Sequence, residues 1–375
     1  MKTVNGIFAS AKVFADGPDA YALAQIQMIC DHPASRGSKI RVLPDVHPGK
    51  VGTIGLTMTV GGSILPNLVG IDIGCGITLA RIKQKKVEFQ KLDTVIRENI
   101  PAGFGIRKKI HRFYENFDTT RLYCHRHLNQ DRTARRLGTL GGGNHFIELD
   151  KDSSGSLYAA VHSGSRHLGK EVTEYYLQQG QKALKEQGIQ VPYELTVLDG
   201  ALKEAYLHDQ QIVQEYAALN RAAILDEMIK GMKWKVQETI SCSHNYIEMN
   251  SKETSFAGGI LRKGAVSAKK GEPVIIPVNM RDGILLGTGK GNEDWNYSAP
   301  HGSGRILRRD MVKEKYTVSD FKNEMKGIYC PCIGKETLDE APFAYRGMEK
   351  IMEAIGDAAE ITQVLKPVYS FKAGN

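Results

Sequence analysis

The sequence feature that most constrains the fold is a series of polar clusters placed where strand-like runs end. All six clusters carry His, Asp or Cys, and five of them also carry glycine. They lie at residues 44–49, 70–76, 138–145, 161–166, 243–245 and 299–305. Glycine at the end of a strand lets the backbone approach a ligand closely, and functional residues gather on such loops. We therefore expect the chemistry of this chain to reside on loops that follow strands.

The segments around these clusters mix strand-like and helix-like patterns. The spacing of apolar residues predicts strands at 40–43, 52–60, 76–83, 146–149, 157–161, 239–249, 273–278, 284–286 and 368–371. Helices are predicted at 19–30, 89–96, 171–187 and 344–359, with a long helical segment at 200–230. No βαβ period repeats, and no Pro/Ser-rich linker divides the chain. These patterns predict one intertwined α/β domain over residues 1–375, with mixed sheets flanked by helices.

Composition excludes several classes of protein. With 375 residues, 41% of them hydrophobic and 25% charged, the chain has the composition of a soluble globular protein. It contains no run of 18 apolar residues that could span a membrane. Residues 1–6 lack the apolar core of a signal peptide, so we expect a cytoplasmic protein whose six cysteines are free thiols.

The net charge of +8 is too modest to establish a nucleic-acid partner. Six arginines nevertheless gather at 108–136, a stretch with little apolar periodicity. We interpret this stretch as a basic surface excursion or helical insertion and as a candidate face for RNA. A solvated basic face is the commoner meaning of such a run.

The clusters contain a set of residues that suits a transition metal. The set comprises one thiol, one carboxylate and three imidazoles: Cys75, Asp72, His145, His162 and His244. Asp72 and Cys75 are three residues apart on a glycine-flanked turn, so both can face one ion. Such ligands favour a divalent transition metal, or two ions bridged by the thiolate, over the oxygen-rich sites of Ca²⁺ or Mg²⁺. The alternative is that each histidine is an ordinary buried or surface residue.

Two clusters also suit phosphate. The sequences at 162–166 and 301–305 share a pattern of small residues that ends in Arg166 and Arg305. Small residues expose backbone N–H groups to an anion, and arginine binds phosphate through two hydrogen bonds. Ordinary surface turns are the alternative interpretation. The chain has no GxxxxGK[ST] motif and no GxGxxG at a βα turn, which argues against a P-loop or a Rossmann site.

Taken in order, these motifs resemble the RtcB family of GTP-dependent RNA ligases. Members join RNA 3′-phosphate or 2′,3′-cyclic-phosphate ends to 5′-hydroxyl ends. The resemblance runs from Pro44 to Lys372 and is carried by PDVHPG at 44–49, DxxCG at 72–76, GTLGGGNH at 138–145, HSGSR at 162–166, HN at 244–245, RKGA at 262–265, HGSGR at 301–305 and the closing lysine. It implies a large α+β domain of RtcB type with its active site in a central cleft.

The resemblance also implies roles for individual residues. Asp72, Cys75, His145, His162 and His244 match the ligands of two Mn²⁺ ions, with Cys75 as the bridging thiolate. His301 matches the histidine that attacks the GTP α-phosphate and becomes His–GMP, which is followed by an RNA(3′)pp(5′)G intermediate. The remaining matches are Asn144 for nucleotide phosphates, Tyr345 and Lys372 for guanine, Arg166 and Arg305 for RNA or nucleotide phosphate, and Asp45 for an acidic residue near the metals.

The implied partners are GTP and RNA with broken ends, in RNA repair or tRNA splicing. The physiological RNA, the metal in the cell, the need for an activating protein and the oligomeric state stay open. Departures from the family pattern are Gly74, Ser243, Leu261 and Arg281 in the 280–283 loop, and they point to a divergent branch. Two other functions remain alternatives: a metal-dependent phosphodiesterase or phosphatase on RNA ends, and a non-catalytic RNA-binding protein.

Overall fold

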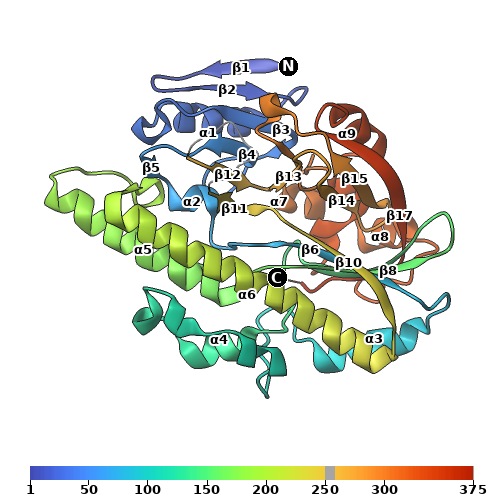
Figure 1. The fold of residues 1–375 in the computed structure, drawn as a ribbon. Helices are drawn as coiled ribbons and strands as arrows, with labels where there is room; N and C mark the ends of the chain where they lie inside the picture. Colours follow the sequence, from blue (N-terminus) through green and yellow to red (C-terminus); the bar gives the residue numbers. More distant parts are fainter. Residues whose placement is uncertain (250–257, 375) are drawn as a thin grey trace.

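The computed structural model describes residues 1–249 and 258–374. Two large sheets form its centre (Figure 1). The six-stranded sheet contains, in spatial order, β1 (Lys2–Asn5), β2 (Ser10–Val13), β3 (Ile40–His47), β4 (Ile54–Thr59), β12 (Ile260–Lys263) and β11 (Asn245–Glu248). The seven-stranded sheet contains β10 (Val236–Ser243), β6 (Gly76–Ile82), β8 (Leu157–Ser163), β7 (Phe146–Lys151), β17 (Ala359–Phe371), β15 (Gly283–Gly289) and β14 (Pro273–Asn279). The predicted α+β class with mixed sheets is confirmed.

Two short strand pairs and a set of helices complete the described structure. β13 (Ala265–Ser267) pairs with β16 (Ser298–Pro300), and β5 (Ser63–Ile64) pairs with β9 (Leu198–Asp199). The helices are α1 (Ala20–Cys30), α2 (Pro66–Val69), α3 (Phe89–Asn99), α4 (Gln130–Arg136), α5 (Arg166–Glu186), α6 (Gly200–Met232), α7 (Arg309–Lys315), α8 (Val318–Glu324) and α9 (Met348–Ala354). None of the described helices is both long enough and apolar enough to cross a membrane.

The long helix α6 fixes several site loops. It packs beside α5 and against β6 and β8 (Figure 1). Its buried Arg221 donates Nη1 hydrogen bonds to the carbonyl oxygens of Gly74 (2.9 Å) and Ser163 (3.1 Å). The neighbouring Asn220 accepts from the Gly138 N–H (2.8 Å) and donates to the Gly164 carbonyl (3.1 Å). Because buried polar groups must be paired, these contacts hold three loops in register on one helix.

Two predicted elements near the site differ in the structure. The single strand expected at 239–249 is two strands, β10 and β11, which belong to different sheets and are separated by His244. The helix expected at 344–359 is wrong in extent, because α9 covers only Met348–Ala354. Strand β17 begins at Ala359 and replaces the short strand expected at 368–371, since its residues pair with both β15 and β7.

The basic stretch 108–136 forms short 3₁₀ turns and α4. It contributes buried residues to the largest hydrophobic core, namely Phe117, Leu122, Cys124 and Leu128. The backbone N–H groups of Tyr123 and Cys124 donate to the carboxylate of Asp209 in α6 (2.9 and 3.1 Å). The stretch is therefore anchored on α6, and only part of its surface is open to a partner.

Candidate functional site

The candidate metal ligands lie at one edge of the seven-stranded sheet. Strands β10, β6, β8 and β7 are consecutive neighbours in that sheet. Gly76 pairs with both Ser243 and Ser163, and Phe146 pairs with His162. The turns that carry Asp72, Cys75, His145 and His244 therefore meet His162 at the same edge. The antiparallel register brings together residues that are up to 172 positions apart in the chain, from Asp72 to His244.

Five side chains converge there around the thiol of Cys75. Its Sγ lies 3.4 Å from Nε2 of His145 and 3.4 Å from Nε2 of His162. His162 Nε2 lies 3.3 Å from His244 Nε2, and His145 Nε2 lies 3.0 Å from Asp72 Oδ2. Two ligand groups result, Cys75–His162–His244 and Asp72–Cys75–His145, and Cys75 belongs to both. The Cys75 sulfur is thus within reach of a cation held by either group.

The chemistry of the donor set fits a cation. Nδ1 of His162 lies 3.1 Å from the Asn144 carbonyl, which can only accept, so Nδ1 carries the proton and Nε2 has a free lone pair. That lone pair faces the Cys75 sulfur and a second imidazole nitrogen. Burial lowers the pKa values of His162 and His244 well below the usual range, so the imidazoles stay neutral. Burial and the nearby charge of Asp72 raise the pKa of the Cys75 thiol well above the usual value, so a bound cation would have to displace its proton. Neutral imidazoles and a thiol directed at one point are groups that a transition metal binds.

Position 164 leaves no room for a side chain beside Asp72. A Cβ atom built on Gly164 would lie 2.1 Å from Asp72 Oδ1, far inside van der Waals contact. Any larger residue would displace the Asp72 carboxylate. Burial opposes the charge on Asp72, but the hydrogen bond with His145 and the charge of Arg166 together hold its pKa well below the usual value. The carboxylate is thus ionised and fixed in place.

His301 lies beside this cluster on a separate element. It follows β16, and its ring packs edge-on against His244 with centroids 4.8 Å apart. Its Nδ1 lies 2.8 Å from Oδ2 of Asp45, which is fully buried in β3. Gly264 of the RKGA motif has φ +61°, and a Cβ there would come within 3.0 Å of the His301 ring. Glycine at 264 therefore permits the close approach of the backbone to His301.

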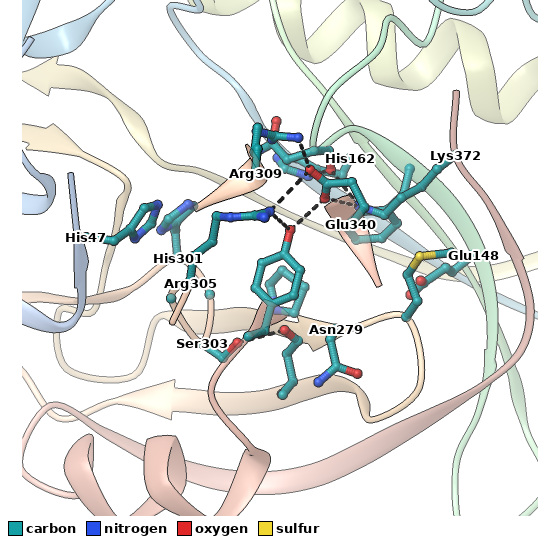
Figure 2. Close-up of a pocket in the computed structure, with 18 residues that line it drawn as sticks. His47, Glu148, His162, Asn279, His301, Ser303, Arg305, Arg309, Glu340 and Lys372 are labelled. Carbon is teal, nitrogen blue, oxygen red and sulfur yellow. Dashed lines mark hydrogen bonds and ion pairs between the residues drawn. The ribbon is translucent and has the colours of Figure 1, made fainter. Parts of the chain in front are cut away.

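A cavity of about 270 Å³ opens next to His301 (Figure 2). His47, His162 and His301 supply its imidazole groups, Arg305, Arg309 and Lys372 its cations, and Phe146, Met280 and Tyr345 apolar surface. Lys372 follows β17, whose last residue pairs with β7 beside the metal-ligand cluster. The cavity thus combines an apolar wall with several cations, a lining that suits a nucleotide, and it is called the nucleotide-sized cavity below.

Two carboxylates in this cavity have opposite environments. Glu340 accepts from Lys372 Nζ (2.9 Å), as Figure 2 shows. It also accepts from the Tyr345 hydroxyl (2.6 Å). Burial opposes its charge, but Lys372, Arg309 and Arg305 lower its pKa to about 2. Glu148 has one side-chain donor, the Ser370 hydroxyl at 3.0 Å, and burial raises its pKa to about 7.

A second cavity lies on another side of the metal-ligand cluster. It is lined by Asp72 and by the basic residues Arg132, Arg136, Arg166, His167 and Lys170. Arg166 starts α5 with φ +57°, a conformation that non-glycine residues rarely adopt and that costs of order 1 kcal/mol or more. Its Nη1 lies 3.0 Å from His145 Nδ1. The strained backbone aims the guanidinium between the cluster and this basic cavity.

Comparison with known proteins now agrees with the motifs. The family model described as tRNA-splicing ligase RtcB matches residues 25–125 and 118–373. The protein named RNA-splicing ligase RtcB1 of Escherichia coli strain ATCC 25922 is 32% identical over 371 residues, which cover 89% of this chain and 90% of that protein. This chain belongs to the RtcB family. The tRNA-splicing ligase RtcB of Aeropyrum pernix, a more distant relative, is 27% identical over 399 residues, 83% of each chain.

The structure separates the residues predicted from this RtcB resemblance into three places. The five expected metal ligands form the cluster, and Asn144, His301, Arg305, Tyr345 and Lys372 line the nucleotide-sized cavity. Asp45 contacts His301, and Arg166 lines the second cavity. Arg281 pairs with Asp282 and Glu324, so its guanidinium is engaged outside the nucleotide-sized cavity.

The sequence analysis did not place Glu148, Arg309 or Glu340 in the site of this RtcB-family protein, although all three line the first cavity. Phe146 and Glu148 are two residues apart on β7 and both line the cavity, so the alternation of a strand could have placed Glu148 there. Arg132 and Arg136 belong to the basic stretch predicted at 108–136, and their spacing of four residues on α4 puts both on one helix face. Glu340 lies in a 3₁₀ turn between buried neighbours, and no local pattern marks it.

Proposed function

We propose that this protein is an RNA ligase that joins 3′-phosphate or 2′,3′-cyclic-phosphate ends to 5′-hydroxyl ends, with GTP and Mn²⁺. The relatives named above are RNA- or tRNA-splicing ligases. The observation that carries the proposal is His301, which is bonded to buried Asp45 and lies between a metal-ligand cluster and a nucleotide-sized cavity. A phosphatase or phosphodiesterase on RNA ends needs no such cavity, so ligation is favoured over hydrolysis.

His301 has the geometry of a nucleophile towards phosphorus. The Asp45 carboxylate accepts a hydrogen bond from Nδ1–H, which leaves the lone pair on Nε2. In the proposed first step Nε2 forms a bond to the α-phosphorus of GTP, and the bond from that phosphorus to the bridging oxygen of pyrophosphate breaks. The ring becomes positively charged, and the Asp45 carboxylate stabilises this charge through Nδ1–H.

The metal ligands would be the two groups that share Cys75, namely Cys75–His162–His244 and Asp72–Cys75–His145. Bound Mn²⁺ would supply Lewis-acid polarisation of phosphate oxygens. The neutral His162 and His244 and the ionised Asp72 already have the protonation states that ligands need, whereas the Cys75 thiol, whose pKa burial raises, would lose its proton when it binds a metal.

The nucleotide-sized cavity suits GTP. Arg305 and Arg309 offer guanidinium groups to phosphate oxygens. Guanine presents hydrogen-bond donors on its N1 and N2 atoms and an acceptor at O6, and Glu148 and Lys372 together offer the complementary groups. Of the two carboxylates in the cavity, that of Glu148 accepts fewer hydrogen bonds from side chains than that of Glu340. This difference favours Glu148 for contact with the base.

The basic second cavity suits an RNA strand. Arg132, Arg136, Arg166 and Lys170 line it, and burial and the charges of Arg166 and Arg132 lower the pKa of Arg136. A polyanion that enters between cations crowded in this way relieves their mutual repulsion, which favours binding of the polyanion. The first cavity includes His162 and the second includes Asp72, so both open onto the metal-ligand cluster. The guanylylated end and the 5′-hydroxyl end would meet there, in RNA repair or tRNA splicing.

Sealing of defined RNA ends tests this proposal. Two RNAs, one with a 3′-phosphate and one with a 5′-hydroxyl, are incubated with the protein, GTP and Mn²⁺, and the products are resolved by length. We expect a joined RNA that requires both GTP and Mn²⁺ and that His301→Ala abolishes. Dephosphorylated or ring-opened ends without joined RNA would instead support the hydrolase alternative.

A further inference from the structure

The carboxylate of Glu340 contacts four of the polar side chains that line the nucleotide-sized cavity. Its Oε1 lies 2.5 Å from Arg309 Nη1 and 3.5 Å from Arg305 Nη1. Its Oε2 accepts from the Tyr345 hydroxyl at 2.6 Å and from Lys372 Nζ at 2.9 Å. Both oxygens are thus used by four side chains, and all four of these side chains line the cavity.

The four partners come from separate parts of the chain. Lys372 follows β17, Arg309 starts α7, and Arg305 and Tyr345 form an isolated bridge between two loops. Arg305 also donates to the Tyr345 hydroxyl (3.1 Å) and stacks over its ring, with its guanidinium carbon 5.0 Å from the ring centroid. No sheet or helix fixes these side chains relative to one another, so the shared carboxylate is their common anchor.

We propose that Glu340 is a positioning residue for the nucleotide: its carboxylate holds Lys372, Tyr345, Arg305 and Arg309 in the arrangement that receives the base and phosphates. This inference rests on the proposed function for its consequence, but the anchoring itself does not. A cavity organised in advance loses less conformational freedom when its ligand binds. Long cationic side chains have much freedom to lose, so the anchor adds affinity although it carries the same sign of charge as the phosphates.

The sign of the effect separates positioning from simple electrostatics. Glu340→Gln removes one negative charge from the wall of the cavity, so electrostatics alone predicts tighter binding of GTP. Positioning predicts weaker binding. We expect the KM for GTP in self-guanylylation to rise about tenfold, with a smaller change in kcat. The glutamine amide has one acceptor oxygen in place of two, so it cannot accept hydrogen bonds from all four side chains. A lower KM in Glu340→Gln would overturn the proposal.

The matched control is Asp339→Asn. Asp339 is adjacent, equally buried and ion-paired to Arg309 and Lys313, but its carboxylate contacts neither Lys372 nor Tyr345. It removes the same charge at nearly the same place. We expect a KM for GTP within about twofold of wild type. A rise equal to that of Glu340→Gln would show that general charge or stability, and not the anchor, sets the affinity.

A second readout needs neither nucleotide nor activity. Lys372 is labelled with acetic anhydride in the intact protein, and its acetylation is measured by peptide mass spectrometry. Only the uncharged amine reacts, and Glu340 opposes the loss of charge that burial would otherwise cause, while Tyr345 and Glu148 also face this amine. We expect Lys372 to be labelled about tenfold faster in Glu340→Gln, as for a drop of roughly one in the pKa of the amine.

The milder variant Glu340→Asp keeps the charge but shortens the side chain, and we expect intermediate labelling in a folded protein. Unchanged labelling of Lys372 in both Glu340 variants, with melting temperatures near that of wild type, would refute the anchoring. If wild type forms no guanylate but labelling changes as expected, the proposed function fails while the anchoring stands. The two failures are therefore distinguishable.

Discussion

The Nδ1 atom of His301 lies 2.8 Å from Oδ2 of Asp45, and the other carboxylate oxygen of Asp45 has no hydrogen-bond partner in the described structure. Asp45 is fully buried in β3, while His301 follows β16, so the contact joins two different sheets. The carboxylate therefore serves His301 above all, and it directs the free lone pair of the ring to Nε2.

The first prediction concerns this pair. Asp45→Asn keeps the shape of the side chain but removes the charge that stabilises the ring once Nε2 has reacted. We expect the rate of covalent labelling by GTP to fall by roughly 100-fold or more, with GTP binding retained. The exposed Asp16 supplies a matched control, Asp16→Asn, which should react at the wild-type rate. Equal rates in Asp45→Asn and wild type would contradict the role of Asp45.

The second prediction concerns metal content. Cys75 belongs to both ligand groups, whereas His244 belongs to one. We expect Cys75→Ala to lose both Mn²⁺ ions and His244→Ala to lose one, because a missing bridging ligand opens both sites. Mass spectrometry of the metal in protein equilibrated with Mn²⁺ measures the number bound per chain. Equal losses in the two variants would show that Cys75 does not bridge.

The third prediction concerns RNA. Arg132→Ala and Arg136→Ala should each weaken RNA binding several-fold and reduce the salt dependence by about 0.7 in the log–log slope, without changing guanylylation. Arg135→Ala is the control on the same helix, because Arg135 pairs with Asp131 (2.8 Å) and is not among the residues that line the basic cavity. Filter binding at several salt concentrations measures both quantities. An equal effect of Arg135→Ala would show that RNA binds to the basic surface in general and not to this cavity.

The fourth prediction concerns the choice of base. Burial raises the pKa of Glu148 to about 7, so this carboxyl is largely protonated at pH 6 and ionised at pH 8. Because the guanine N1–H and N2–H groups need an ionised acceptor, we expect GTP to bind more tightly as pH rises through 7.

In the variant Glu148→Gln this pH dependence should disappear. The ratio of the affinity for GTP to the affinity for ATP should fall about 10- to 100-fold, the range expected for the loss of a hydrogen bond to a charged group. Equilibrium binding of both nucleotides between pH 6 and 8 is the measurement. Unaltered discrimination by Glu148→Gln would assign the choice of base to other residues.

Much of the fold could be predicted from the sequence where one periodicity dominates. The helix of residues 19–30 and the long helix near 200–230 are confirmed as α1 and α6, with the side chain of Asp19 capping α1. The predictions failed where tertiary pairing overrides local pattern. The helix predicted at 344–359 ends early, at Ala354, and the strand predicted at 368–371 begins at Ala359, because β17 pairs with both β15 and β7.

The site was predictable to the extent that its residues lie in short motifs. Cys75, His145 and His301 each stand within a glycine-rich cluster, which marks a backbone that approaches a ligand. Glu340 and Arg309 carry no such signal, because their place in the cavity depends on loops far apart in sequence. For the arginine cluster at 108–136, sequence alone does not show which arginines share a surface: Arg112 and Arg121 pair with Asp226 and Glu215, while Arg132 and Arg136 line the basic cavity.

The central claim is that His301 attacks GTP. Protein incubated with Mn²⁺ and GTP labelled at the α-phosphate is denatured and digested, and the label is mapped by mass spectrometry. We predict one GMP per chain on a peptide that contains His301, stable to alkali and released by acid, and absent from His301→Ala. Label on another residue, persistence of the label in His301→Ala, or joining of RNA ends without any covalent guanylate would contradict the account.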